Sequence, residues 1–289
     1  MKGRLELRVV FALAATVVIW ASAFAGIRAG LEGYSAGHLA LLRFLVASGL
    51  LVTYAVVTRM PLPAWRDLPA VLIGGFLGFT VYHVGLSFGE VTVESGPASV
   101  LIASVPVFTA ILAVIFLRER LGTLGWIGTG LSFSGVVLIS TGEAGTLALE
   151  PGAFPILLAA ISEAMFFVFQ KPYLDKYGSL RFTTYAIWGG TLFMLIFAPG
   201  LASAAADAPL AATISVVYLG IFPTVVAYLA LAYAFARMPA ANAVSFLYLV
   251  PALAFLIAWL WLGEVPTFLS IVGGVVVLAG VIIVNARRQ

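Results

Sequence analysis

PVFTAILAVIFLRE (residues 106–119) and PALAFLIAWLWLGE (residues 251–264) are the two stretches that decide the fold of this chain. Each opens with proline, continues through a largely apolar run and closes with glutamate, and the two lie 145 residues apart. Three more pairs match at the same offset: Phe88 and Tyr233, Gly128 and Gly273, and Gly135 and Gly280. A single period that joins five pairs indicates a duplication. We therefore predict two related halves, residues 1–145 and 146–289.

The composition places both halves in a membrane. Hydrophobic residues make up 63% of the 289 residues and charged residues only 9%, whereas soluble domains carry about 25% charged residues. A span requires roughly 20 mostly apolar residues, so ten spans with short connections account for nearly the whole length. Within lipid only helices and closed barrels pair every backbone group, and the apolar runs lack the alternation of a membrane barrel. The sequence therefore predicts an all-α membrane protein of ten transmembrane helices.

Ten apolar runs are the candidate spans. They lie at residues 9–29, 36–58, 69–90, 95–117, 122–141, 152–171, 181–200, 210–236, 240–262 and 266–286. The first run also resembles a signal peptide, because basic residues precede it and Ala21-Ser22-Ala23 resembles a cleavage site. The second half keeps an equivalent of this run, so we interpret it as a span.

Basic residues predict the orientation of the spans, because short loops rich in Lys and Arg stay in the cytoplasm. Thirteen of them lie at the termini or in even-numbered loops: Lys2, Arg4, Arg8, Arg59, Arg66, Arg118, Arg120, Lys171, Lys176, Arg181, Arg237, Arg287 and Arg288. This predicts that both termini are cytoplasmic. With five spans in each half, the two halves then enter the membrane from opposite sides. Such inverted repeats hold a substrate near the midplane of the bilayer and alternate access by rocking one half against the other.

Several short motifs resemble the drug/metabolite transporter superfamily in their order and spacing. They are Trp20-Ala21-Ser22-Ala23-Phe24, Leu42-Arg43-Phe44 and the two proline-to-glutamate stretches. The likeness covers essentially the whole chain and is strongest to the ten-helix EamA-type members, and among these to the YddG-type exporters of aromatic amino acids. The resemblance implies export of amino acids or other metabolites through a central cavity between the halves, lined by spans one, three, four, six, eight and nine.

Glu163 is the strongest candidate for a functional charge, because it lies in the middle of the sixth apolar run. An acidic side chain at that depth costs about 2.5–3.5 kcal/mol on insertion scales unless it faces a partner or water. We favour a role in attracting a substrate ammonium group or in taking up a proton during the cycle. The alternative is a protonated glutamate that forms a hydrogen bond for packing alone.

Aromatic side chains and a histidine are expected to line the cavity. Trp20 and Phe24 are four residues apart and share one helix face, as do Phe79, Tyr82 and His83 in the third run. Tyr82 and His83 carry polar atoms near mid-span, where unpaired groups are costly, and this favours a place in the cavity. For any single aromatic of a membrane helix, packing or lipid contact is the more common role.

The fourth and ninth runs carry hydroxyl groups that precede a central proline. Ser99, Ser245 and Tyr248 are candidates for the cavity lining, although small hydroxyls also serve helix packing. Proline removes a backbone hydrogen bond and bends a helix, and bent helices in a membrane often line a cavity. The candidate hinges are Pro106, Pro223 and Pro251, and a static kink is the alternative for each.

Arg43 lies well inside the second run. We favour the interpretation that its side chain reaches back to the membrane interface, as long basic side chains do. The alternative is contact with an anionic group of the substrate.

The predicted function is export of small metabolites. The resemblance favours amino acids, and an aromatic lining favours aromatic solutes through stacking and cation contacts. Two alternatives stay open: an intramembrane enzyme that uses Glu163 and His83 as an acid/base pair, and a passive channel.

The chain has no P-loop and no H-E-x-x-H sequence. We therefore expect no enzymatic activity, no cofactor and no metal. The basic residues are scattered, which argues against a nucleic-acid partner. The expected partners are a small solute and membrane lipid, the expected location is the bacterial inner membrane, and the sequence indicates no oligomeric state.

Overall fold

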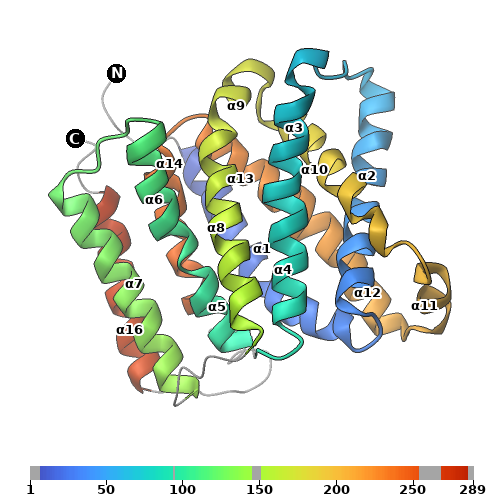
Figure 1. The fold of residues 1–289 in the computed structure, drawn as a ribbon. Helices are drawn as coiled ribbons and strands as arrows, with labels where there is room; N and C mark the ends of the chain where they lie inside the picture. The colour runs from blue at the N-terminus through green and yellow to red at the C-terminus, as the bar shows by residue number, and fades with distance from the viewer. Residues whose placement is uncertain (1–6, 94, 145–150, 254–267, 286–289) are drawn as a thin grey trace.

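Every regular element in the described part of the computed structural model is a helix (Figure 1). The described residues are 7–93, 95–144, 151–253 and 268–285. The all-helical prediction is therefore confirmed over these ranges. The expected boundary between the halves, near residue 145, and most of the second proline-to-glutamate stretch lie outside them.

The first half is a series of apolar helices, some of them interrupted. Its elements are α1 (Leu7–Leu31), α2 (Ala36–Thr58), η1 (Trp65–Asp67), α3 (Leu68–Gly75), η2 (Phe76–Val81), α4 (Tyr82–Gly89), α5 (Ser95–Ile102), α6 (Val105–Phe116) and α7 (Thr123–Ala144). Helix α2 begins after Ser35, whose hydroxyl accepts the backbone N–H of His38, and it ends at Arg59 in a left-handed conformation. A polar cap and a left-handed residue are ordinary signals for the two ends of a helix.

The second half repeats this order. Its elements are α8 (Ala153–Phe169), α9 (Lys171–Tyr177), α10 (Ser179–Met194), η3 (Leu195–Phe197), α11 (Leu201–Asp207), α12 (Leu210–Leu219), η4 (Gly220–Val226), α13 (Ala227–Phe235), α14 (Ala240–Ser245), η5 (Phe246–Tyr248) and α16 (Phe268–Asn285). A π-helical turn occurs at equivalent positions of the two halves. It is η2, between α3 and α4, in the first half and η4, between α12 and α13, in the second. π-Helical turns of this kind often accompany functional sites.

The described residues contain five helices that are long and apolar enough to cross a membrane. The number rises to six when α8 and α9, which meet at a bend of 45°, are counted as one span. Four further apolar helices are shorter, at Val105–Phe116, Thr123–Leu138, Ala240–Leu253 and Ile271–Val284. The count of ten spans stays a prediction.

Helices α7 and α16, which hold equivalent positions in the two halves, pack closely along one another (Figure 1). A side chain at Gly128 would meet the carbonyl oxygen of Gly280 at 2.7 Å, and one at Gly135 would meet that of Gly273 at 2.7 Å. Residue numbers rise along one helix as they fall along the other, so the pair is antiparallel. Each glycine therefore faces the counterpart of the other one, which is the contact expected of halves related by a two-fold axis.

The two halves are also interleaved elsewhere. Helix α1 packs against α12 and α13 of the second half, while α8 packs against η2 and α4 of the first. Glycine permits two of the close approaches: Gly75 faces the carbonyl of Ala186 on α10, and Gly220 faces the carbonyl of Arg43 on α2. Small residues at such crossings are typical of membrane helix pairs. The centre of the molecule is thus an interface between the halves.

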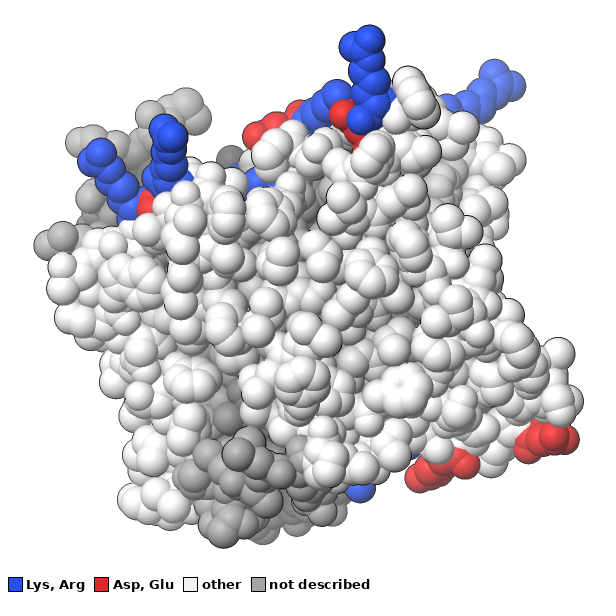
Figure 2. All heavy atoms as spheres, viewed as in Figure 1, with Lys and Arg blue, Asp and Glu red and all other residues white. Residues whose placement is uncertain are grey.

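The surface separates into an uncharged band and charged ends. Figure 2 shows a broad white middle, with most of the visible Lys and Arg at one end of the molecule. Large apolar side chains project from the helices, and Phe11, Val57 and Ile196 are each at least 75% exposed. Such a band fits the hydrocarbon layer of a bilayer. Two ion pairs, Lys171 with Glu119 and Lys176 with Asp67, join α9 to the segment after α6 and to η1, at the end that the charge pattern places in the cytoplasm.

Candidate functional site

A pocket lies between the two halves and is lined by both. The first half contributes residues of α1, α2, α4, α5 and α6, and the second half contributes α8 and the helical segment before residue 252. The lining residues are Trp20, Ala23, Phe24, Ile27, Arg43, Tyr82, His83, Leu86, Ser99, Ile102, Ala103, Val105, Pro106, Glu163, Phe167, Leu247, Val250 and Pro251. We call this space the central pocket.

Most of the residues singled out from the sequence meet in the central pocket. Those that line it are Trp20, Phe24, Arg43, Tyr82, His83, Ser99, Pro106, Glu163 and Pro251. Four others do not line it: Phe79, Pro223, Ser245 and Tyr248. The structure thus brings together residues from segments more than 200 positions apart in the chain.

Glu163 is fully buried and belongs to a hydrogen-bonded chain of three side chains. The hydroxyl of Tyr228, on α13, donates to Oε1 of Glu163 over 2.6 Å and lies 3.2 Å from Nε2 of His83. A hydroxyl has only one hydrogen to donate, so it accepts its second bond from His83. Among the described residues, Oε2 of Glu163 and Nδ1 of His83 have no hydrogen-bond partner. Both ends of the chain therefore retain capacity to bind a ligand.

Arg43 is buried in the centre of the molecule, with 2% of its surface exposed. Its Nε donates to Oγ1 of Thr224 over 2.6 Å, and the Thr224 hydroxyl donates in turn to the carbonyl of Leu219. The favoured interpretation, that Arg43 reaches back to the membrane interface, is therefore wrong. Close packing of α2 against η4 holds the guanidinium inside and supplies its hydroxyl partner.

Trp20 forms one wall of the pocket. Its indole N–H donates to the carbonyl of Pro223 over 3.1 Å, and its ring stacks on Phe167 with centroids 6.4 Å apart and planes 9° apart. The edge of Tyr228 also contacts this ring, at a centroid distance of 5.0 Å. A tryptophan held in this way offers a fixed aromatic surface.

Phe79 supports the pocket from behind and does not line it. It is fully buried, stacks on the His83 ring at 6.4 Å with planes 10° apart, and packs against Tyr228 at 4.8 Å. The shared face of Phe79 and His83 was foreseen from their spacing. Which of the two residues lines the central pocket depends on where helices of the second half cross this one.

The three prolines lie at irregular places in their helices. Pro106 lies in the first turn of α6, just after the break that separates α5 from α6. Pro251 follows the 3-10 turn η5, and Pro223 lies within the π-helical turn η4. Pro223 contributes to the site through its backbone carbonyl, which accepts from Trp20.

Of the hydroxyl candidates, only Ser99 lines the central pocket. The Ser245 hydroxyl donates to the carbonyl of Asn242, and Tyr248 is fully buried in a cluster with Val136 and Val277. Ser245 and Tyr248 therefore contribute to helix packing, the alternative role considered for these hydroxyl groups.

Tyr228 and Thr224 are central to the site and were not foreseen. The repeat carried a signal for Tyr228, because His83 shifted by 145 positions falls on it. Thr224 had no comparable signal, since a threonine in an apolar helix commonly bonds to its own helix.

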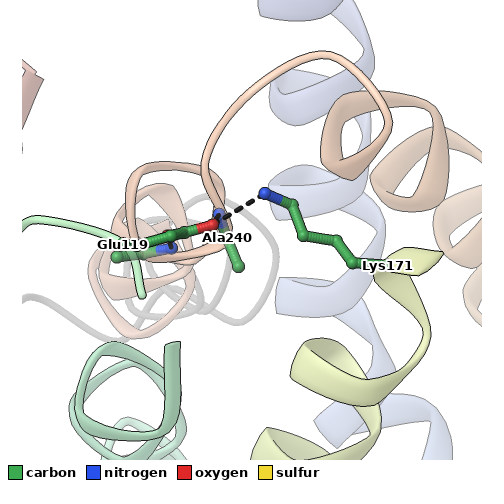
Figure 3. Close-up of polar contacts among 4 residues, drawn as sticks. Glu119, Lys171 and Ala240 are labelled. Carbon is green, nitrogen blue, oxygen red and sulfur yellow. Dashed lines mark hydrogen bonds and ion pairs between the residues drawn. The ribbon is translucent and has the colours of Figure 1, made fainter. Parts of the chain in front are cut away.

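A polar contact joins the two halves at one end of the molecule (Figure 3). Glu119, just after α6, accepts from Nζ of Lys171 over 2.7 Å and from the backbone N–H of Ala240 over 3.0 Å. Its second oxygen accepts the N–H of Ala241 over 3.4 Å. Lys171 opens α9 and Ala240 opens α14, so one carboxylate joins three elements at the end that the charge pattern places in the cytoplasm.

The central pocket combines polar and aromatic groups. It offers a carboxyl oxygen, a guanidinium, an imidazole nitrogen and several aromatic faces. No group of three His, Cys, Asp or Glu side chains that could hold a metal occurs among the described residues.

Comparison with known proteins shows similarity along nearly the whole chain. The EamA-like transporter family matches residues 7–141 and again residues 150–286. YdfC, an uncharacterized transporter of Bacillus subtilis, is 50% identical over 263 residues, which are 91% of this chain and 86% of YdfC. A probable terminal-alkyne amino-acid exporter of Streptantibioticus cattleyicolor is 41% identical over 280 residues, 97% of this chain and 94% of that protein. A solved crystal structure shares the fold with a TM-score of 0.76 at 14% identity, covering 96% of each chain.

Proposed function

This chain belongs to the EamA-like transporter family, and on that premise we propose that it exports amino acids, with a preference for aromatic side chains, by alternating access through the central pocket. It is a multi-pass transporter of the bacterial inner membrane. The substrate class is supported by the relative, 41% identical, that is named a probable amino-acid exporter.

The observation that carries the proposal is that an acidic and a basic side chain line one pocket. Glu163 and Arg43 both line the central pocket, and the described residues show no ion pair between them within 4.0 Å. An amino acid brings the two complementary charges, an ammonium for Oε2 of Glu163 and a carboxylate for Arg43. Charge-assisted hydrogen bonds of this kind are the strong ones.

Aromatic rings supply the rest of the proposed binding surface. Trp20, Phe167 and Tyr82 line the same space as the two charges. Offset stacking and edge contacts between rings contribute about 0.5–1.5 kcal/mol beyond the burial of apolar area. Aromatic amino acids therefore gain more from this pocket than aliphatic ones.

Alternating access is proposed to follow from the inverted halves. We place both termini in the cytoplasm, with five spans in each half and the boundary near residue 145. In this proposal, the contact of Glu119 with Lys171 and with the start of α14 closes the end assigned to the cytoplasm. Release of this contact would let the halves rock and expose the central pocket to the cytoplasm, where the exported solute binds.

The experiment is counterflow in proteoliposomes loaded with unlabelled L-phenylalanine. We expect saturable uptake of labelled L-phenylalanine and L-tyrosine, with weaker uptake of L-alanine. Uptake without saturation or counterflow would instead support a channel, and conversion of the solute to a new compound would support an intramembrane enzyme.

A further inference from the structure

A second pocket lies one helical turn farther along the helices that line the central pocket. On α1, Phe24 and Ile27 line the central pocket, whereas Arg28 and Leu31 line the second one. After α4, Glu90 lines the second pocket, one turn beyond Leu86 of the central one. The second pocket therefore lies beyond the central one along α1 and α4, toward the loop between α1 and α2.

We call this second space the outer pocket, because the charge pattern places that loop outside the cytoplasm. Its lining residues are Arg28, Leu31, Glu32, Tyr34, Ser35, Ala36, Phe88, Glu90, Val91 and Thr92.

Glu90 is the unusual group of the outer pocket. Only 7% of its surface is exposed, and neither carboxyl oxygen has a hydrogen-bond partner among the described residues. Burial of a carboxylate is costly when no partner offsets the lost water. Native structures rarely leave such a group without a hydrogen-bond partner. A bound ion or ligand that supplies the partner is one ordinary explanation.

Arg28 faces the same space from α1. It is exposed, it acts electrostatically on the Glu90 carboxyl, and the described residues show no ion pair from it within 4.0 Å. A base and an acid therefore line one pocket without joining each other. The arrangement repeats the chemistry of Glu163 and Arg43 in the central pocket.

We propose that the outer pocket is a second binding site for a zwitterionic amino acid, with its ammonium on Glu90 and its carboxylate on Arg28. The proposal rests on the proposed function, because it identifies a binding site for the exported solute between the central pocket and the outside. Apolar groups in the lining, Leu31, Phe88 and Val91, are available for the side chain.

The test is equilibrium binding of labelled L-phenylalanine to the purified full chain in nanodiscs. We expect two molecules bound per chain in the wild type. Glu90→Gln and Arg28→Gln should each weaken one of the two sites about tenfold or more, because each removes a charge-assisted hydrogen bond. Arg28 is exposed, so its variant tests the site even if Glu90→Gln does not fold.

Two controls separate specific contact from general attraction. Asp207 is an exposed carboxylate in the last position of α11 that lines neither pocket, and we expect Asp207→Asn to leave both affinities within about twofold, as screened surface charges do. Phenethylamine lacks the carboxylate, so its competition should depend on Glu90 and not on Arg28. 3-Phenylpropionate lacks the ammonium, and its competition should show the opposite dependence.

One bound molecule per chain in the wild type overturns the outer site, and so do equal affinities in the Glu90→Gln and Asp207→Asn variants. Binding in nanodiscs requires no transport. Two bound molecules without counterflow therefore refute export and keep the site, whereas counterflow with one bound molecule refutes the site and keeps export.

Discussion

The hydroxyl of Tyr228 lies 3.2 Å from Nε2 of His83, and the two residues are 145 positions apart, one repeat period. Ser132 and Val277 are separated by the same 145 positions, and the Ser132 hydroxyl contacts the Val277 carbonyl at 3.4 Å. A residue touches its own counterpart only near the axis that relates two equivalent units. This axis therefore passes beside the central pocket, so the proposed rocking of the halves would displace the pocket walls on both sides.

Replacement of the buried acid should remove recognition of the ammonium. We expect Glu163→Gln to lower the counterflow rate of L-phenylalanine at limiting concentration by about tenfold or more, because a neutral amide replaces one partner of a charge-assisted bond. Asp207→Asn, at an exposed acid in the last position of α11, is the matched control and should transport as the wild type does. Unchanged transport by Glu163→Gln, with an unchanged pH profile, would contradict the assigned role.

Weakening of the proposed cytoplasmic closure, the contact between Glu119 and Lys171, should expose the central pocket to the cytoplasm. The chain has no cysteine, so Ala23→Cys places a single thiol in the lining. We expect Lys171→Gln to raise the rate at which a cytoplasmic thiol reagent labels this cysteine, by about fivefold for a partly exposed pair worth about 1 kcal/mol.

Arg66→Gln is the control for this closure, because Arg66 is an exposed cation that forms no ion pair with a described residue. Equal labelling rates in the Lys171 and Arg66 variants would show that the Lys171–Glu119 contact does not limit access.

The contact of α7 with α16 should depend on its glycines. Gly128→Ala would place a methyl group 2.7 Å from the carbonyl oxygen of Gly280, and overpacking of this kind costs about 1–3 kcal/mol. We expect a lower free energy of unfolding in detergent. Gly130 lies on the same helix with nothing within 4 Å of an added Cβ, and Gly130→Ala should unfold as the wild type does. Similar losses in both variants would contradict the close packing of these helices.

The inverted arrangement predicts that the ends of the first half lie on opposite faces of the membrane. Single cysteines at Lys2 and at Gly145 should react with impermeant thiol reagents from opposite sides. Both positions lie outside the described residues, so the expectation depends on the charge pattern alone. Reaction of both cysteines from one side would overturn the topology and, with it, alternating access.

Much of the candidate site was predictable from sequence, because the membrane makes polar groups conspicuous. Glu163 and His83 were recognised since a titratable group at mid-span is costly without a partner. Arg43 was misjudged because its depth alone does not tell whether the side chain follows its helix outward or crosses to a neighbour. Thr224, its partner on η4, becomes visible only when α2 and η4 are packed together.

The sequence alone determined the membrane location, the helical class and the duplication. Composition and a repeated pattern can be read from the chain without knowing which segments pack together. Tertiary structure alone decided which residues face the central pocket. Phe79 and His83 share one helix face, yet His83 lines the space and Phe79 supports it, because helices from the other half cross at that point. The lining depends on where two interleaved halves meet, and that placement is a property of the packed molecule.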